Sequence, residues 1–399
     1  MKLNFFLKIL ILSLLTILYS CANDEDAIEL SSENKILSFE LSKNSYSKTF
    51  DISENSVGGT VDSDIELTSI NLNITVSEKA SITPSPSSIT SITGPLTFTV
   101  IAENGDERIY NVSISRELST ENLILDFRIN DNNFSTSTTI NNGNNIITQR
   151  LPQTVDLSNL DISIVFSERA TIAPTIDNLV DFSEPVSLTV TSESGIERTY
   201  IVNIDHMDEA FSETCSEMNA WKWFGGDNRT NAPDNGPFDR NVGTGQAIIL
   251  ERDISPSSFS VHLGGGGSEG FVFDEDGTPY NEDVELKLNI RNVEGSIIFS
   301  TTSIVSGSFN EGYISFDLTN SNLFLEDNTT YIFQWYLVDG ASLGVTTSSS
   351  GNTNEDASGF CFNGGYSGQS KISENTDLEN FNVWFEHPWN FNIILEGNQ

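Results

Sequence analysis

The side chains best suited to ligand chemistry lie in the second half of this 399-residue chain. All five tryptophans lie beyond residue 210, and four of them stand beside polar or glycine-rich stretches. Flat aromatic rings in such surroundings can stack on sugar rings. The candidate ligand-binding residues are Trp221, Trp223, Trp384, Trp389 and Tyr366. The alternative for each ring is packing beneath loops, whereas Trp335, in phase with the apolar side of its predicted strand, is expected in the core.

Acidic side chains gather just after residue 273. Residues 274–277 read Asp-Glu-Asp-Gly, and Asp283 follows shortly after. Carboxylates are the hard oxygen ligands that calcium prefers, but Pro279 interrupts the stretch and no bidentate glutamate stands where an EF-hand loop requires one. Calcium binding by Asp274, Asp276 and Asp283 is therefore one interpretation. A polar hairpin turn is the other.

The composition argues against several function classes. Three histidines and three cysteines leave little material for a zinc or imidazole centre. A chain with 57 carboxylates always supplies candidate acid–base pairs, but no Ser-His-Asp, zinc or phosphate-loop motif selects among them. The formal net charge of −38 opposes phosphate neutralisation, which excludes a basic nucleic-acid groove. We therefore expect a protein that is not an enzyme and has no nucleic-acid partner.

The N-terminus predicts export. Two lysines precede the nearly apolar stretch 9–18, which is too short to span a bilayer comfortably. The sequence Leu-Tyr-Ser-Cys at 18–21 resembles a bacterial lipobox, and this resemblance implies a signal peptide over 1–20, acylation of Cys21 and an acidic linker over 21–33. The acidic residues 24–26 resemble the surface-export signal of Bacteroidetes-type lipoproteins, so an outer-membrane lipoprotein on the cell surface is expected. A plain signal peptide or a single-pass anchor is the alternative.

Two cysteines remain once Cys21 is lipidated. Cys215 and Cys361 form an even pair in an oxidising compartment, which predicts a disulfide between them. A catalytic cysteine is the alternative, but it lacks an obvious histidine partner, since the predicted C-terminal domain contains only His262 and His387.

A repeat occupies the first half of the chain. Two matches at a constant offset of 90 define it, 78–84 with 168–174 and 104–114 with 194–204. In each copy two alternating β-rich segments flank a turn, and Asn104-Gly105 is a strong hairpin signal. The predicted modules extend over 34–118 and 119–206, and each contains enough short strands for an immunoglobulin-like sandwich.

Both copies share a Gly-x-Glu-Arg-x-Tyr-x-Val hairpin, and the second contains Asp-Phe-Ser-Glu-Pro-Val at 181–186. These motifs resemble the tandem Ig-like domains of unknown function in Bacteroidetes-type surface lipoproteins, which implies a spacer role. Residues 207–399 resemble the jelly-roll domains likened to carbohydrate-binding modules, on a Gly-Gln strand at 245–250, Thr-Thr-Tyr at 329–331 and Gly-Gly-Tyr-Ser-Gly at 364–368. The predicted fold is all-β: two tandem Ig-like β-sandwiches and then a larger jelly-roll-like β-sandwich.

Three functions fit these features, in order of preference. The first is a membrane-anchored lipoprotein whose C-terminal sandwich binds an extracellular ligand such as a neutral glycan. A neutral ligand is favoured because an acidic surface repels uronic-acid and sulfated polymers. The second is a structural stalk or adhesin that binds another protein, and the third is a glycan or peptide hydrolase. Ligand binding is expected in 207–399 and not in 34–206.

Overall fold

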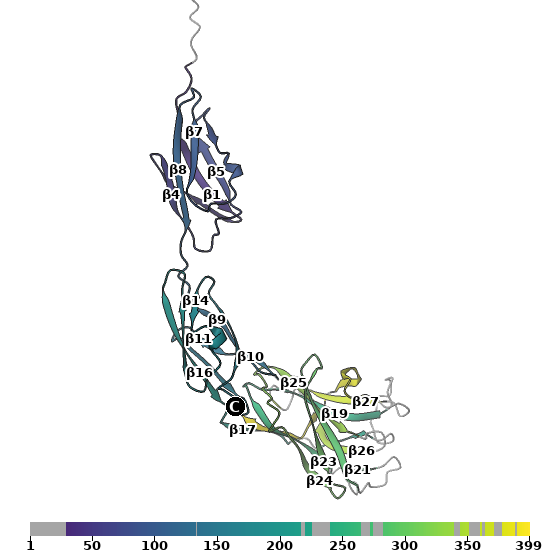
Figure 1. Ribbon diagram of the computed structural model, residues 1–399. Coiled ribbons are helices and arrows are strands. Elements are labelled where there is room, and N and C mark those ends of the chain that lie inside the picture. Colours follow the sequence, from purple (N-terminus) through teal and green to yellow (C-terminus); the bar gives the residue numbers. More distant parts are fainter. Residues whose placement is uncertain are drawn as a thin grey trace, which may run out of the picture. The chain divides into compact units, whose positions relative to one another are not determined.

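The computed structural model (Figure 1) describes residues 29–399 except 133, 217–219, 226–239, 265–271, 274–281, 339–343, 351–359, 361–363, 371–376 and 388. The chain divides into two compact units, residues 1–119 and 120–399. The described residues form strands joined by loops and three-residue 3-10 turns, so the all-β prediction is confirmed. Among them, no helix has the length and apolar character needed to cross a membrane. Cys21 and Cys361 lie outside the described residues.

The first module is a sandwich of two sheets. The three-stranded sheet has the order β2-β1-β5, formed by Tyr46–Thr49, Ile36–Lys43 and Asn71–Val76. The five-stranded sheet has the order β3-β4-β8-β7-β6, formed by Ile52–Ser53, Ser56–Val61, Glu107–Arg116, Leu96–Ile101 and Ser81–Thr83. The predicted hairpin is confirmed because β7 and β8 pair antiparallel around Gly105, whose φ of 91° a residue without a side chain adopts readily.

The second module repeats this arrangement. Its three-stranded sheet has the order β10-β9-β13, formed by Ser135–Ser137, Ile124–Asn130 and Asp161–Phe166. Its five-stranded sheet has the order β11-β12-β16-β15-β14, formed by Thr139–Asn141, Ile146–Leu151, Glu197–His206, Val186–Thr191 and Thr171–Ala173.

Equivalent tyrosines hold the first strand of each module. The Tyr110 hydroxyl accepts the Ile36 N–H at 3.2 Å, and the Tyr200 hydroxyl accepts the Ile124 N–H at 3.3 Å. Both rings are at most 1% exposed, so both tyrosines lie in the cores of their modules. A buried hydroxyl needs such a partner, so the repeated tyrosine is explained by packing and not by ligand contact.

The C-terminal sandwich consists of an eight-stranded and a six-stranded sheet. The eight-stranded sheet has the main order β17-β30-β20-β26-β18, formed by Ala210–Cys215, Ile393–Asn398, Ser255–Gly264, Gly344–Ser350 and Ala220–Gly225. Attached to it are β21 at Val272–Phe273, β24 at Glu311–Asp317 and β29 at Asn390–Phe391. The six-stranded sheet has the order β23-β22-β25-β19-β27-β28, formed by Ile297–Val305, Val284–Arg291, Thr330–Leu337, Arg240–Ile249, Gly365–Ser370 and Trp384–His387.

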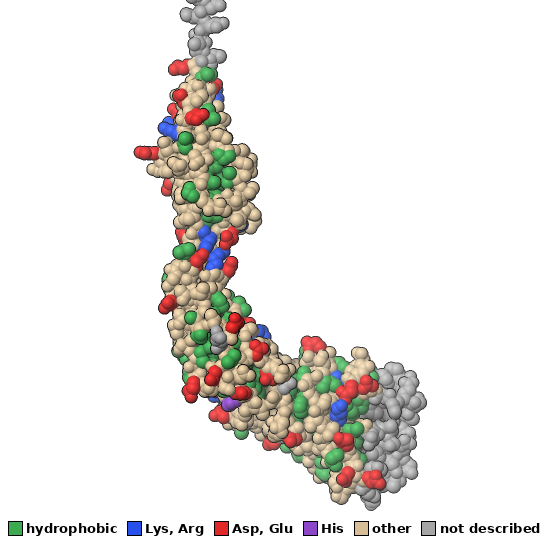
Figure 2. Space-filling view, viewed as in Figure 1, with side chains coloured by type: hydrophobic (Ala, Val, Ile, Leu, Met, Phe, Trp, Pro, Cys, Tyr) green, Lys and Arg blue, Asp and Glu red, His purple; other side chains and the backbone are tan. Residues whose placement is uncertain are grey.

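Alternate residues of the two sheets form one core between them. Phe259 of β20 contacts Phe333 and Trp335 of β25, with ring centroids 4.7 and 5.7 Å apart. Trp335 is fully buried, as expected from its strand phase. Outside the core the surface is acidic, and Figure 2 shows Asp and Glu side chains spread over the visible face of the described residues.

Candidate functional site

Strand β22 alternates apolar and polar side chains, and the polar ones lie on the face of the six-stranded sheet turned away from the core. Such alternation normally means that the polar side chains face water. Here Asn289 is 0% exposed and Arg291 is 1% exposed. Another part of the chain therefore covers this outer face.

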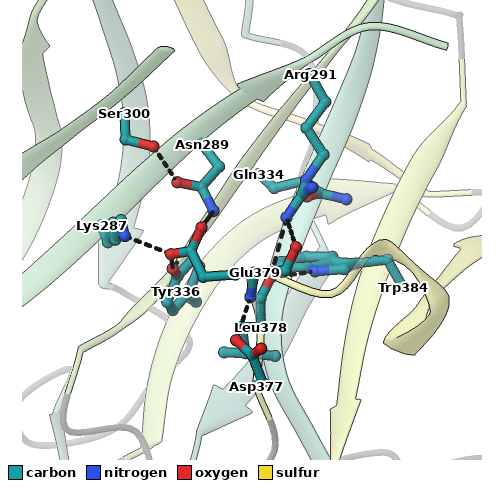
Figure 3. A network of polar contacts seen from close by, with 10 residues as sticks. All are labelled: Lys287, Asn289, Arg291, Ser300, Gln334, Tyr336, Asp377, Leu378, Glu379 and Trp384. Atoms are coloured by element: carbon teal, nitrogen blue, oxygen red, sulfur yellow. Dashed lines mark hydrogen bonds and ion pairs between the residues drawn. The ribbon is translucent and has the colours of Figure 1, made fainter. Parts of the chain in front are cut away.

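The covering segment is residues 377–383, which include the 3-10 turn η4 at Phe381–Val383. Arg291 binds it to the sheet (Figure 3), because the guanidinium donates to the carbonyl oxygens of Leu378 at 3.1 Å and Glu379 at 2.8 Å. The same guanidinium donates to Gln334 Oε1 at 2.7 Å and to the Gly295 carbonyl at 2.6 Å. Burial lowers the pKa of Arg291, and the neighbouring Glu379 charge opposes that shift.

Trp384 completes the cover. Its Nε1–H donates to the Leu378 carbonyl at 3.0 Å, its ring lies 6.2 Å from that of Tyr336, and the residue is 6% exposed. Gly243 makes this placement possible, since a Cβ there would lie 2.7 Å from Cη2 of Trp384. The expectation that Trp384 offers a free ring face to a sugar is therefore wrong in this structure: the ring packs on the sheet.

Glu379 presents the main charged group of the outer face. Its carboxylate accepts hydrogen bonds from Lys287 Nζ, from the Tyr336 hydroxyl at 2.8 Å and from Asn289 Nδ2 at 3.3 Å. Partial burial raises the pKa of Glu379, but these hydrogen bonds outweigh it and the pKa is lowered overall. Burial, together with the Glu379 carboxylate, raises the pKa of Tyr336, so the phenol stays a donor. The carboxylate is thus an ionised acceptor held in one orientation.

Tyr366 lies on the same outer face, on β27. It stands opposite Gly245 on one side and Glu386 on the other. Burial and the nearby Glu386 charge raise the pKa of Tyr366 to about 12, and its hydroxyl donates to Glu386 Oε1 at 3.4 Å. Its half-buried ring lies 6.2 Å from that of Phe381 in the covering segment. We call Lys287, Tyr366, Glu379 and Glu386 the outer-face site.

The remaining predicted aromatics are not part of this site in the described structure. Trp389 is half-buried and packs against the sandwich core. Trp221 and Trp223 lie on β18, whose backbone is described but whose side chains are not. The structure therefore places Tyr366 and Trp384 in one outer-face cluster, whereas Trp389 packs against the sandwich core.

The predicted calcium ligands are only partly described. Asp274 and Asp276 lie outside the described residues. Asp283 is exposed, and its Oδ1 accepts the Gly307 N–H at 2.9 Å, so it fixes the turn after β23. Across the described part of the chain, no three His, Cys, Asp or Glu residues are grouped to hold a metal ion. Calcium binding remains a hypothesis.

Cys215 ends β17 and is 2% exposed. It is not a free thiol. Its expected partner Cys361 lies outside the described residues, so the pairing of these two cysteines remains a prediction.

The comparison with protein families concerns the two N-terminal modules. Residues 36–114 and residues 124–204 each match the family described as "SGBP, N-terminal", where SGBP denotes a surface glycan-binding protein. The matches cover the modules that the repeat predicted and amount to less than half of the chain. A search of curated proteins gave no match.

Three solved structures are similar over most of the chain. A Bacteroides thetaiotaomicron protein described as a glycoside hydrolase candidate is 10% identical, covers 80% of this chain and 96% of its own, and gives a TM-score of 0.21. A carbohydrate-binding module of the β-sandwich superfamily is 6% identical, with coverages of 67% and 94% and a TM-score of 0.16. SGBP-B of the Bacteroides ovatus mixed-linkage glucan utilization locus, in complex with a heptasaccharide, is 10% identical, with coverages of 79% and 100% and a TM-score of 0.13. TM-scores this low do not establish a shared fold.

Proposed function

We propose that this protein is a lipid-anchored surface glycan-binding protein whose C-terminal sandwich binds a neutral extracellular glycan. The observation that carries this proposal is the double family match, since both N-terminal modules match the SGBP N-terminal family. Proteins with such modules are named for binding glycans at the cell surface, and the third domain of this chain is a separate β-sandwich with a polar, aromatic-bordered outer face.

The outer-face site has the groups that sugar recognition needs. The ionised Glu379 carboxylate can accept hydrogen bonds from sugar hydroxyls, and such charge-assisted bonds are stronger than neutral ones. Lys287 supplies a donor beside it, and Tyr366 supplies an aromatic ring. Because the site is fixed by Arg291 beneath it, little ordering is needed when a ligand binds.

The charge of the chain favours a neutral glycan. With 57 acidic and 19 basic residues, the protein repels polymers of uronic acids or sulfated sugars. A lowered pKa makes Glu379 a poor proton donor at neutral pH, which suits binding better than the general-acid step of glycoside hydrolysis. Incubation with a bound polysaccharide should therefore release no new reducing ends.

Affinity electrophoresis of the full mature chain in gels containing neutral polysaccharides tests the binding function. We expect retardation by at least one of them, and about tenfold weaker binding for Glu379→Gln and for Tyr366→Ala. The matched controls are Glu251→Gln, an exposed carboxylate of the same sandwich, and Tyr313→Ala on the eight-stranded sheet. If no polysaccharide retards the protein, the proposed function is wrong. If retardation occurs and neither variant changes it, the glycan binds at a different site.

The anchor is tested separately. The lipobox-like order at the N-terminus supports acylation of Cys21, with the two modules as spacers between membrane and sandwich. Cells grown with a fatty-acid analogue should label the wild-type protein and not Cys21→Ala. Equal labelling of both would show that Cys21 is not the acylated residue.

A further inference from the structure

The unit of residues 120–399 contains a polar cavity where the second module meets the C-terminal sandwich. Its volume is about 550 Å³, which lies within the range of small-ligand pockets. Ten residues line it, six from the module and four from the sandwich, and every one of them is polar or charged. We call it the junction cavity.

Direct contacts hold the two walls of the junction cavity together. Phe134 of the module stacks on Phe324 of the sandwich, with ring centroids 5.1 Å apart and planes inclined by 30°. Gln149 Nε2 donates to Asp253 Oδ2 at 3.2 Å across the same junction. A cavity whose walls are already in contact needs little rearrangement to accept a ligand.

The junction cavity offers both hydrogen-bond donors and acceptors. Asp253 accepts both the Gln149 amide and, at 2.9 Å, the Asp327 N–H, so its carboxylate is fixed in place. Within the described parts of the chain, the Glu326 carboxylate and the Thr139 hydroxyl have no hydrogen-bond partner in the protein. Arg128 adds a cationic donor whose Nε binds Asp126 at 3.1 Å.

We propose that the junction cavity is a second saccharide-binding site, for a short neutral oligosaccharide. Hydroxyl groups both donate and accept, so a saccharide can use the open Glu326 carboxylate, the Thr139 hydroxyl and the Arg128 guanidinium together. Three carboxylates against one guanidinium disfavour an anionic sugar. The choice of a saccharide as ligand rests on the proposed function. The residues of the junction cavity are entirely different from those of the outer-face site, and six of them belong to the second module.

Native mass spectrometry of the full mature chain with neutral tetrasaccharides of glucose, mannose or xylose counts the occupied sites. Thr139→Trp fills the cavity with a bulky ring, and Thr171→Trp is its matched control. Both threonines are exposed and lie in three-residue strands at opposite edges of one sheet. We expect two bound tetrasaccharides in the wild type and in Thr171→Trp, and one in Thr139→Trp.

A second variant removes charge without adding bulk. It is made in a protein that also carries Tyr366→Ala, which weakens binding at the outer-face site. In that background Glu326→Gln should weaken tetrasaccharide binding to the junction cavity about tenfold. Glu168→Gln, which changes an exposed carboxylate of the second module that does not line the junction cavity, is the control and should leave that binding unchanged.

The outcomes separate the two proposals. A single bound saccharide that is lost in Tyr366→Ala and kept in Thr139→Trp overturns the junction cavity alone. A single saccharide that is lost in Thr139→Trp and kept in Tyr366→Ala supports the cavity and overturns the outer-face site. Binding of no neutral tetrasaccharide, or equal binding of tetragalacturonate in the cavity, overturns the junction proposal as well.

Discussion

Replacement of Arg291 by methionine tests whether one buried cation holds the covering segment on the outer face. Methionine has a similar length and an apolar side chain, so the volume is largely kept while the donors are lost. Arg291 hydrogen-bonds three buried acceptors, Gln334 Oε1 and the carbonyls of Gly295 and Leu378. Its fourth acceptor, the Glu379 carbonyl, is only partly buried and can bind water instead.

The expected loss of folding stability follows from the acceptors that Arg291→Met leaves without a donor. A buried acceptor left without a donor costs about 1 kcal/mol at the low end, so three of them cost about 3 kcal/mol. Removing the buried charge of Arg291 also removes its desolvation penalty, which offsets part of this cost. For that reason we use the lowest value for each acceptor. For a domain of this size, about 3 kcal/mol corresponds to a decrease of about 6–12 °C in the unfolding midpoint.

The assay can follow the C-terminal sandwich alone, because every tryptophan lies beyond residue 210. Thermal unfolding monitored by tryptophan fluorescence therefore reports on this domain and not on the two modules. Lys287→Met is the control, since it lies on the same face of the same strand and loses only a partly exposed ion pair worth at most about 1 kcal/mol. Equal midpoints for Arg291→Met and Lys287→Met would refute the idea that Arg291 holds the segment.

Three further predictions concern the same domain. Cys215→Ser should lower the stability of the sandwich by up to about 5 kcal/mol and leave the two modules unaffected, if Cys215 pairs with Cys361; two free thiols in the folded, non-reduced protein would contradict the pairing. Gly243→Ala should cost about 1–3 kcal/mol and shift tryptophan emission to longer wavelength, because the new methyl group collides with Trp384; an unchanged spectrum would show that the ring does not lie there. Glu379→Gln should destabilise the protein more at pH 6 than at pH 3, measured by urea unfolding at both values. The pKa of Glu379 is lowered by folding, so its stabilising effect is complete above the ordinary glutamate value of 4.5 and is lost as the pH falls through the lowered pKa. An equal effect at both pH values would contradict this.

The modules were predictable from the sequence because their determinants are local and occur twice. A turn glycine between two alternating segments specifies the β7–β8 hairpin without help from the rest of the chain. The repeated tyrosine at 110 and 200 lies in phase with the apolar side chains of its strand, and burial in both copies follows from that phase.

The outer-face site was not predictable in the same way. The alternation of apolar and polar residues along β22 indicates which side chains share a face of the sheet. It does not indicate whether that face is exposed to water or covered by another segment of the chain. Arg291 hydrogen-bonds Leu378 and Glu379, which lie 87 and 88 residues further along the chain. A local sequence pattern does not predict contacts between residues so far apart in the sequence. The sequence offered one weak signal: four successive outward positions of β22 carry polar or charged side chains. The same long-range cover explains why Trp384, expected to be accessible, is buried.

The position of β30 in the eight-stranded sheet constrains when the C-terminal sandwich can fold. This strand, Ile393–Asn398, lies between β17 and β20 and pairs with both. Each module closes with strands from its own stretch of sequence, so it can fold as soon as that stretch has been synthesised. The sandwich must wait until residue 398 has emerged, with β17 and β20 unpaired along these edges in the meantime. A chain that stops shortly before that point would carry two folded modules and an open sheet, which a chaperone or a protease can bind.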